Sequence, residues 1–168
     1  MSTPEFSHPV DRRRLPKGTV VLDASPEQCR ALARRFDIVA IDRLHAEMSL
    51  EDDGKAVSGR GRLRANIVQS CAVSGEDLRV TIDEPLALRF VPERAPDAEE
   101  VELHESELDE IEFPGDVFDL GEAVAQSLAL AIDPYAVGPE AERARQEAGL
   151  ADEGASGPFA ALAALKKP

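Results

Sequence analysis

Three arginines at alternate positions are the most specific candidate for chemistry in this chain. Arg60, Arg62 and Arg64 lie in the stretch "SGRGRLRA". On one face of a β-strand they would stand about 6.5–7 Å apart, a spacing that suits successive backbone phosphates of a nucleic acid. The alternative is that they pair across a hairpin with Glu47 and Glu51. The sequence leaves both interpretations open, and the two are not exclusive.

Residues that could catalyse a reaction or hold a metal ion are dispersed. His8, His45 and His104 have no helical pairing and no nearby cysteine, whereas a metal site needs more donors at closer spacing. Cys29 and Cys71 are expected to be free thiols. The glycines of "SGRGRLRA" do not have phosphate-loop spacing, and "AVSGE" indicates a turn between strands. We therefore expect no enzymatic activity, no metal or other cofactor, and no small-molecule substrate.

A helix and an antiparallel hairpin are the elements expected to position the arginines. In "DASPEQCRALARRFD", Ser25 is a suitable N-cap and Gln28 a capping-box partner, so we predict a helix over about 26–37. Apolar and polar residues alternate over 44–50, which predicts a half-buried strand. Asp53-Gly54 is a hairpin turn signal.

The return strand sets which face the arginines take. Leu63, Ala65 and Ile67 lie on one face of this strand, so the arginines lie on the other. Gly59 and Gly61 weaken its start and suggest a bulge. A third strand is expected over 78–90, with Pro85 indicating an edge position or a bend.

The second half of the chain adds helices to this meander. A short acidic strand is expected around 108–113. A second amphipathic helix should begin after Asp119, with Glu122 completing a reciprocal cap, and a short polar helix should follow Pro134. The expected fold class is α+β: an antiparallel β-meander, or a partly closed barrel, covered by one or two amphipathic helices.

Charge divides the chain into two parts. Residues 1–92 carry 14 Lys and Arg and 14 Asp and Glu, whereas residues 93–168 carry 5 and 19. We expect one domain over residues 1–135, including an acidic loop at about 93–107, and a flexible or helical extension over 136–168. The acidic loop offers these candidates for binding a partner: Glu99, Glu100, Glu102 and Glu105.

The chain closes on an apolar tail, "GPFAALAALKKP". Phe159, Leu162 and Leu165 recur at a spacing of three, along one side of a short helix. The tail either docks on its own domain or is offered to a partner. We favour the partner, because glycines before the tail separate it from the fold.

The chain also lacks an apolar run of transmembrane length, and its opening lacks the apolar stretch of a secretory signal. We therefore expect a cytoplasmic protein without a membrane partner.

Three stretches make the chain similar to the YceD-type family of large ribosomal RNA subunit accumulation proteins. "PEFSHPV" resembles the opening of alphaproteobacterial members, and "IVQSCAVSGEDLRVTIDEPLALRFVPE" resembles their cysteine-containing strand pair. "GDVFDLGEAVAQSLALAIDPY" and the tail "GPFAALAALKKP" resemble their C-terminal signature. Many members have a second cysteine three positions after the first, where this chain has Ser74 after Cys71. The resemblance implies a role in accumulation of large-subunit (23S) ribosomal RNA, through ribosome assembly or RNA processing.

These observations favour a non-enzymatic assembly factor over two other classes of protein. An acidic chain attracts RNA poorly at long range but suits a basic ribosomal protein. We expect an adaptor whose partner is a large-subunit ribosomal protein or a pre-50S particle. The alternative is a factor that binds ribosomal RNA directly through Arg60, Arg62 and Arg64, and a hydrolase or nuclease is least supported.

Overall fold

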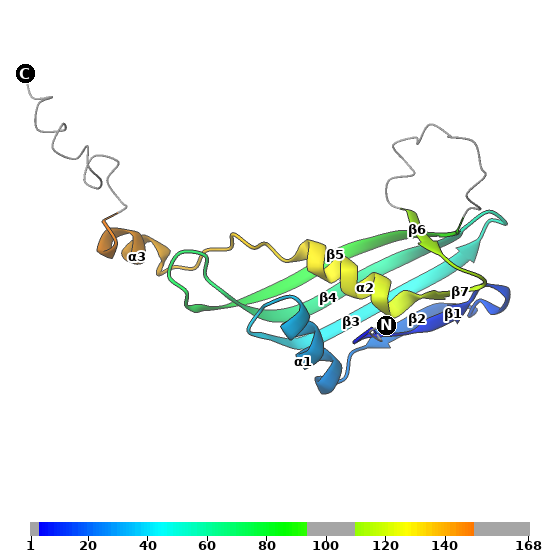
Figure 1. The fold of residues 1–168 in the computed structure, drawn as a ribbon, viewed down its shortest axis with the longest axis horizontal. Helices are drawn as coiled ribbons and strands as arrows, with labels where there is room; N and C mark the ends of the chain where they lie inside the picture. Colours follow the sequence, from blue (N-terminus) through cyan, green and yellow to red (C-terminus); the bar gives the residue numbers. More distant parts are fainter. Residues whose placement is uncertain (1–3, 94–109, 150–168) are drawn as a thin grey trace, which may run out of the picture.

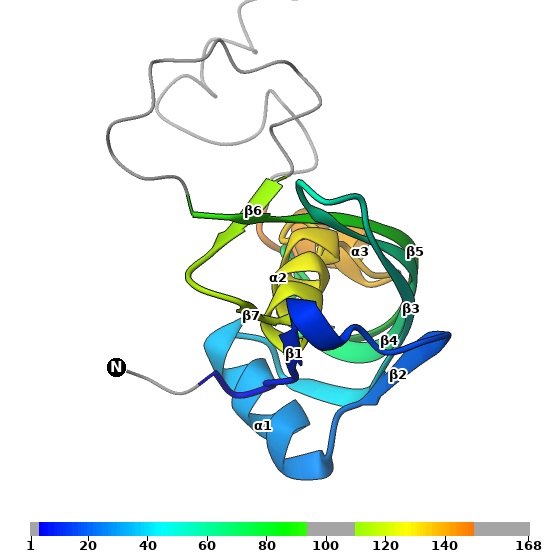
Figure 2. The ribbon, with the colours of Figure 1, turned by 90° about the vertical axis from the view of Figure 1, so that its right-hand side faces the viewer.

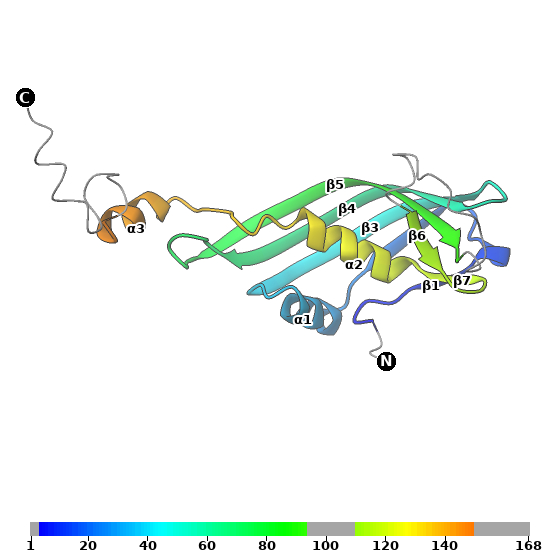
Figure 3. The same ribbon diagram turned by 45° about the horizontal axis from the view of Figure 1, so that its top comes forward.

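The computed structural model describes residues 4–93 and 110–149 of the 168-residue chain. One long curved sheet dominates it, and two helices pack on the concave face of that sheet (Figures 1 and 2). A third helix, α3 (Ala141–Glu147), lies beyond one end of the sheet (Figure 3). The predicted α+β class is confirmed.

The centre of the sheet is formed by the three longest strands. β3 (Ala40–Asp52), β4 (Val57–Ser70) and β5 (Asp77–Pro92) pair antiparallel in chain order. The predicted hairpin turn is confirmed, because Gly54 takes a φ of 87° and the Asp53 carboxylate accepts hydrogen bonds from two following backbone N–H groups. This pairing fixes the faces of β4, as predicted: Leu63, Ala65 and Ile67 are buried.

The edges of the sheet differ from the predicted meander. β2 (Thr19–Asp23) was not predicted from the sequence, and it pairs antiparallel with β3. At the other edge, β6 (Glu110–Phe113) is the predicted acidic strand, but it runs parallel to β5. The five-stranded sheet is therefore mixed, and within the described residues it is open, with β2 and β6 unpaired to each other.

Pro85 lies in a part of β5 that has only one neighbouring strand among the described residues. β6 pairs with residues 89–92 of β5, so the part of β5 that contains Pro85 is hydrogen-bonded to β4 alone among the described strands. Proline is tolerated there because it cannot donate to a second neighbour. The predicted edge position is confirmed.

A small separate sheet joins the two ends of the domain. β1 (Pro9–Asp11) pairs antiparallel with β7 (Val117–Asp119), and a short 3-10 helix, η1 (Arg12–Arg14), follows β1. Phe118 stacks on Phe90, with ring centroids 4.3 Å apart. The N-terminal strand is thereby tied to the core of the main sheet.

The first helix, α1 (Pro26–Arg35), begins as the sequence predicts. The Ser25 hydroxyl accepts from the Gln28 N–H at 3.2 Å, and the Gln28 side chain accepts from the Ser25 N–H at 2.8 Å, which is a complete capping box. The helix ends two residues earlier than predicted, because Asp37 takes a φ of 54°.

The second helix, α2 (Leu120–Ala131), lies along the concave face of the sheet (Figures 2 and 3). Asp119 caps it by accepting from the Glu122 N–H at 3.0 Å, as predicted. The Glu122 side chain does not complete the predicted reciprocal cap, because it forms a bidentate ion pair with Arg35 of α1 instead. This ion pair links the two helices.

Gly59 and Gly61 were expected to mark a bulge, and this was wrong. The pairing of β4 is regular at both glycines, and the register shift lies in β3, between Ile41 and Arg43. The glycines instead allow close packing. A Cβ at residue 61 would overlap the carbonyl oxygen of Glu47, and a Cβ at residue 59 would meet the Met48 side chain at 2.8 Å.

We predict that Gly61→Ala destabilises the fold by about 2 kcal/mol or more, because β3 and β4 must separate to admit the methyl group. Chemical denaturation followed by circular dichroism measures the loss. Arg60→Ala is the control, since residue 60 is exposed and should change the unfolding free energy by less than about 0.5 kcal/mol. Equal stability of the two variants would contradict the packing role of Gly61.

Candidate functional site

The arginine row, formed by Arg60, Arg62 and Arg64, lies on the convex face of the sheet. All three side chains are exposed, as the alternation of β4 predicts. Across the row, β3 places Ser49, Glu47 and His45 opposite the three arginines in turn. The row is thus continuous along one strand but flanked by acids.

The ion pairs of the row differ from the predicted ones. Arg62 and Arg64 pair with Asp83 of β5, and the Arg64–Asp83 separation is 3.7 Å. Glu47 and Glu51, the predicted cross-hairpin partners, make no ion pair with the row in the structure. Because β4 is a central strand, its arginines lie as near to carboxylates of β5 as to those of β3. Pairing with Asp83 also raises the pKa of Arg62.

A histidine beside the arginine row is hydrogen-bonded to two carboxylates. His45 Nδ1 lies 2.7 Å from an Asp23 carboxylate oxygen, and Nε2 lies 3.3 Å from a Glu47 oxygen. Hydrogen bonding to Asp23 and then to Glu47 raises the pKa of His45. Positive and negative side chains therefore alternate across the convex face, and it is not a uniformly basic surface.

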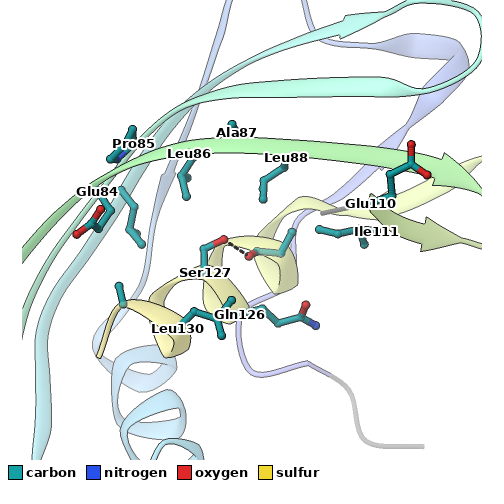
Figure 4. Close-up of a pocket in the computed structure, with 13 residues that line it drawn as sticks. Glu84, Pro85, Leu86, Ala87, Leu88, Glu110, Ile111, Gln126, Ser127 and Leu130 are labelled. Atoms are coloured by element: carbon teal, nitrogen blue, oxygen red, sulfur yellow. Dashed lines mark hydrogen bonds between the residues drawn. The ribbon is translucent and has the colours of Figure 1, made fainter. Parts of the chain in front are cut away.

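The concave side carries a groove between α2 and the free edge of β5 (Figure 4). Its volume is about 680 Å³. Leu86 and Leu88 point from β5 toward the helix (Figure 4), and Leu130 of α2 lines the groove with 88% of its surface exposed. The Ser127 hydroxyl donates to the Ala123 carbonyl at 2.9 Å and is therefore satisfied within α2.

A second hollow of about 310 Å³ continues this groove toward β7. The two hollows share Ile111, Ala123 and Gln126. We call the two together the α2 groove. Its charged lining residues are all acidic, and they are Glu84, Glu110, Glu112, Asp119 and Glu122.

The α2 groove was not predicted from the sequence. Its walls come from β5, β6 and α2, which are far apart in the chain, and no local motif marks their meeting. One signal was available. Leu130 follows Ala129 on the polar side of the helix whose buried face is Val124 and Leu128, so a large apolar residue is exposed there.

Cys71 lies in the turn between β4 and β5, as the sequence predicts for this stretch. Its sulfur accepts hydrogen bonds from the N–H of Ser74 at 3.4 Å and from the N–H of Gly138 at 3.3 Å. Gly138 packs on Leu78, where a Cβ would overlap the leucine side chain. The segment that leads to α3 is thereby held against the turn, and the Ala72 N–H donates to the Ala136 carbonyl at 2.9 Å.

Both cysteines are free thiols, as expected, and both are buried. Hydrogen bonds from the Ser74 side chain, the Ser74 N–H and the Gly138 N–H lower the pKa of the Cys71 thiol to about 6. Burial raises the pKa of the Cys29 thiol. The two thiols are therefore expected to ionise in different pH ranges.

The candidate residues of the acidic loop and of the tail lie outside the described residues. They are Glu99, Glu100, Glu102, Glu105, Phe159, Leu162 and Leu165. Within residues 4–93 and 110–149, no group of three or more His, Cys, Asp or Glu side chains could hold a metal ion. The helices of the same residues include none long and apolar enough to cross a membrane.

We predict that the Cys29→Ala variant shows a single thiolate titration with a midpoint near pH 6, followed by ultraviolet absorbance. Adding Ser74→Ala should raise this midpoint. The Ser74 hydroxyl and the Ser74 N–H both stabilise the Cys71 thiolate by hydrogen bonds, and the substitution removes the hydroxyl, which lowers the pKa more than the N–H does. Cys71→Ala serves as the control and should lack the low-pH transition. A midpoint near 9, the ordinary value, in the Cys29→Ala variant would contradict this account.

The chain was compared with curated proteins, solved structures and models of protein families. Neither the curated proteins nor the solved structures contain a match to the chain. A family model described as "Large ribosomal RNA subunit accumulation protein YceD" matches residues 59–166, from the arginine row through the α2 groove to the apolar tail. This range is more than half of the chain, and we conclude that the protein belongs to the YceD family of large ribosomal RNA subunit accumulation proteins.

Proposed function

We propose that the protein is a non-enzymatic factor that supports accumulation of large-subunit ribosomal RNA by holding a basic protein of the large ribosomal subunit, free or in a pre-50S particle. The observation that carries this proposal is the division of charge. Residues 93–168 contain 19 Asp and Glu but only 5 Lys and Arg, while residues 1–92 are balanced. An acidic excess of this size is complementary to a basic partner.

The fold gathers part of this acidic half on one side. β6, β7 and α2, all from the second half, lie together at the concave face (Figures 2 and 3). Glu110 and Glu112 are on β6, Asp119 is at the end of β7, and Glu122 is on α2. Glu110 and Glu122 are ion-paired with Arg89 and Arg35, so the uncompensated negative charge is that of Glu112 and Asp119. Uncompensated charge of one sign raises the rate at which an oppositely charged protein docks and disfavours partners of like charge.

The proposal that the protein is not an enzyme is supported by the roles of three carboxyl groups whose pKa is lowered. Asp119 caps α2 and accepts from Ser7, while Glu122 and Asp52 pair with the arginines Arg35 and Arg12. In each of these three carboxyl groups, the hydrogen bonds or the ion pair that lower the pKa also stabilise the fold. Perturbed groups in ion pairs and caps are common outside active sites.

Direct RNA binding through Arg60, Arg62 and Arg64 is the alternative function. Its support is that the side chains of Arg62 and Arg64 remain 51% and 54% exposed despite their shared contact with Asp83. The alternating charges of the convex face weigh against it, because phosphate binding depends on a net positive surface.

We predict that large-subunit proteins co-purify with the tagged protein after nuclease digestion, because they are held by protein contacts. A Gln variant of the acidic-loop candidates (Glu99, Glu100, Glu102 and Glu105) should retain clearly less of these proteins at low salt, and the loss should shrink as salt screens the charges. Pull-down with quantitative mass spectrometry measures both effects.

Arg60→Ala, Arg62→Ala and Arg64→Ala in one chain form the matched control. This triple variant should capture partners as the parent does. If nuclease or the triple arginine variant removes the partners while the Gln variant keeps them, the adaptor function is wrong and direct RNA binding is favoured.

We also predict that deleting residues 157–168 leaves the melting temperature within about 2 °C of the parent but reduces association with large-subunit particles. The tail is reserved for a partner in this proposal, so its three large apolar side chains do not contribute to the stability of the domain. Differential scanning calorimetry and sucrose-gradient sedimentation measure the two quantities. A fall of many degrees would place the tail in the core of its own domain.

A further inference from the structure

The α2 groove has an apolar floor that is only partly buried. Leu88 of β5 and Ile111 of β6 are half-buried there, and the buried side chains of Leu63 and Leu86 lie beneath them. Leu130 stands at the rim of the groove as the most exposed large apolar side chain of the described residues, at 88%. An exposed leucine beside an apolar hollow is a feature of protein-binding surfaces.

The strand that borders the groove has a free edge. β6 covers only residues 89–92 of β5, so residues 77–88 have a described neighbour on the β4 side alone. Such an edge presents unpaired backbone N–H and C=O groups to an incoming extended segment, except that Pro85 has no N–H. Residues 84–88, which line the groove, extend over about 17 Å at about 3.3 Å per residue, enough for about five partner residues.

The charge of the α2 groove determines which kind of partner segment can bind in it. Its charged lining residues are five carboxylates, without a Lys or Arg. Glu110 and Glu122 are paired with Arg89 and Arg35, and Asp119 is used as a helix cap. Glu84 and Glu112 are exposed and make no ion pair within the described residues, so they are available to a cationic partner.

The acidic loop leaves and rejoins the sheet next to this groove. The Glu93 N–H donates to the Phe113 carbonyl at 2.9 Å, and the chain returns at Glu110. Residues 94–109 contain seven acids and one base in the sequence. The two ends of this acidic segment therefore attach to the sheet beside the β6 end of the groove.

We propose that the α2 groove is the docking site for an extended, basic segment of a large-subunit protein, whose apolar side chains enter between β5 and α2 and whose lysines or arginines meet Glu84 and Glu112. The identity of the partner rests on the proposed function. The position of the site rests on the groove alone. Every residue that lines the groove lies within the range that matches the YceD family model.

The test uses the full chain and fluorescein-labelled 15-residue peptides that tile the large-subunit ribosomal proteins of the same organism. We expect binding, measured by anisotropy, to basic peptides with alternating apolar residues. Leu130→Glu should weaken it at least about tenfold, because the charge enters the apolar rim. Val21→Glu is the matched control, since Val21 is 52% exposed on β2, away from the groove, and should leave binding within about twofold.

Charge reversal tests the second half of the proposal. Glu84→Lys with Glu112→Lys should weaken binding at least about tenfold and flatten its salt dependence. Glu51→Lys with Glu76→Lys, at exposed positions outside the groove, changes the net charge by the same amount, and this control should have a much smaller effect. Full binding by the Leu130→Glu variant, or by the double lysine variant, would overturn the proposal.

Two other occupants would also overturn it. One is the chain's own tail, shown if the peptide of residues 157–168 binds the tail-deleted chain and Leu130→Glu abolishes that binding. The other is a second copy, shown if the parent dimerises in analytical ultracentrifugation and Leu130→Glu dissociates it. If Leu130→Glu still captures large-subunit proteins after nuclease treatment, the groove proposal fails while the adaptor function stands.

Discussion

The pairing of β4 with β3 on one side and β5 on the other is the constraint on which both faces of the molecule depend. Because alternate residues of a strand face opposite sides, burying Leu63, Ala65 and Ile67 under the helices also sends the arginine row to the convex face. A shift of one residue would exchange the two sets, which makes the register strongly specified. Gly61 adds to this, since β3 approaches it too closely for any side chain. The arginines are thus positioned by packing that they take no part in.

The width of the α2 groove depends on how α2 is anchored, and the helix is anchored at both ends. At the N-terminal end, Asp119 caps the helix and accepts from the His8 N–H, and Glu122 is paired with Arg35. Gly121 allows the backbone at Phe6 to pass close to the helix. At the C-terminal end, the buried Gln69 side chain of β4 donates to the Asp133 carbonyl at 2.7 Å, just beyond the last helical residue. The helix is therefore tied to the rest of the fold at both ends, with the ion pair and the cap at the end where the second hollow lies.

Local patterns in the sequence were enough to predict the elements that form by themselves. The capping box at Ser25, the turn at Gly54 and the alternation of β4 each depend on neighbours within a few residues, and the structure confirms them. What the sequence did not reveal depends on long-range packing. The parallel pairing of β6, the ion pair of Arg35 with Glu122 and the contact of Asp83 with the arginine row join segments that are about 20 to 90 residues apart. The periodicity of a sequence carries no information about contacts between distant segments. For the same reason, the walls of the α2 groove were not predicted.

The small sheet at the N-terminus has a consequence for how the chain reaches this fold. Ser7 bonds Asp119 across 112 positions, and β1 has its partner strand only at β7. Contacts of such long separation form late, because closing the loop costs entropy before any pairing is gained. During synthesis the first strand is made long before its partner, and α2 follows later still. A nascent chain must therefore carry an unpaired strand and an uncovered apolar sheet until about residue 131 has emerged, the kind of intermediate that aggregates or engages chaperones.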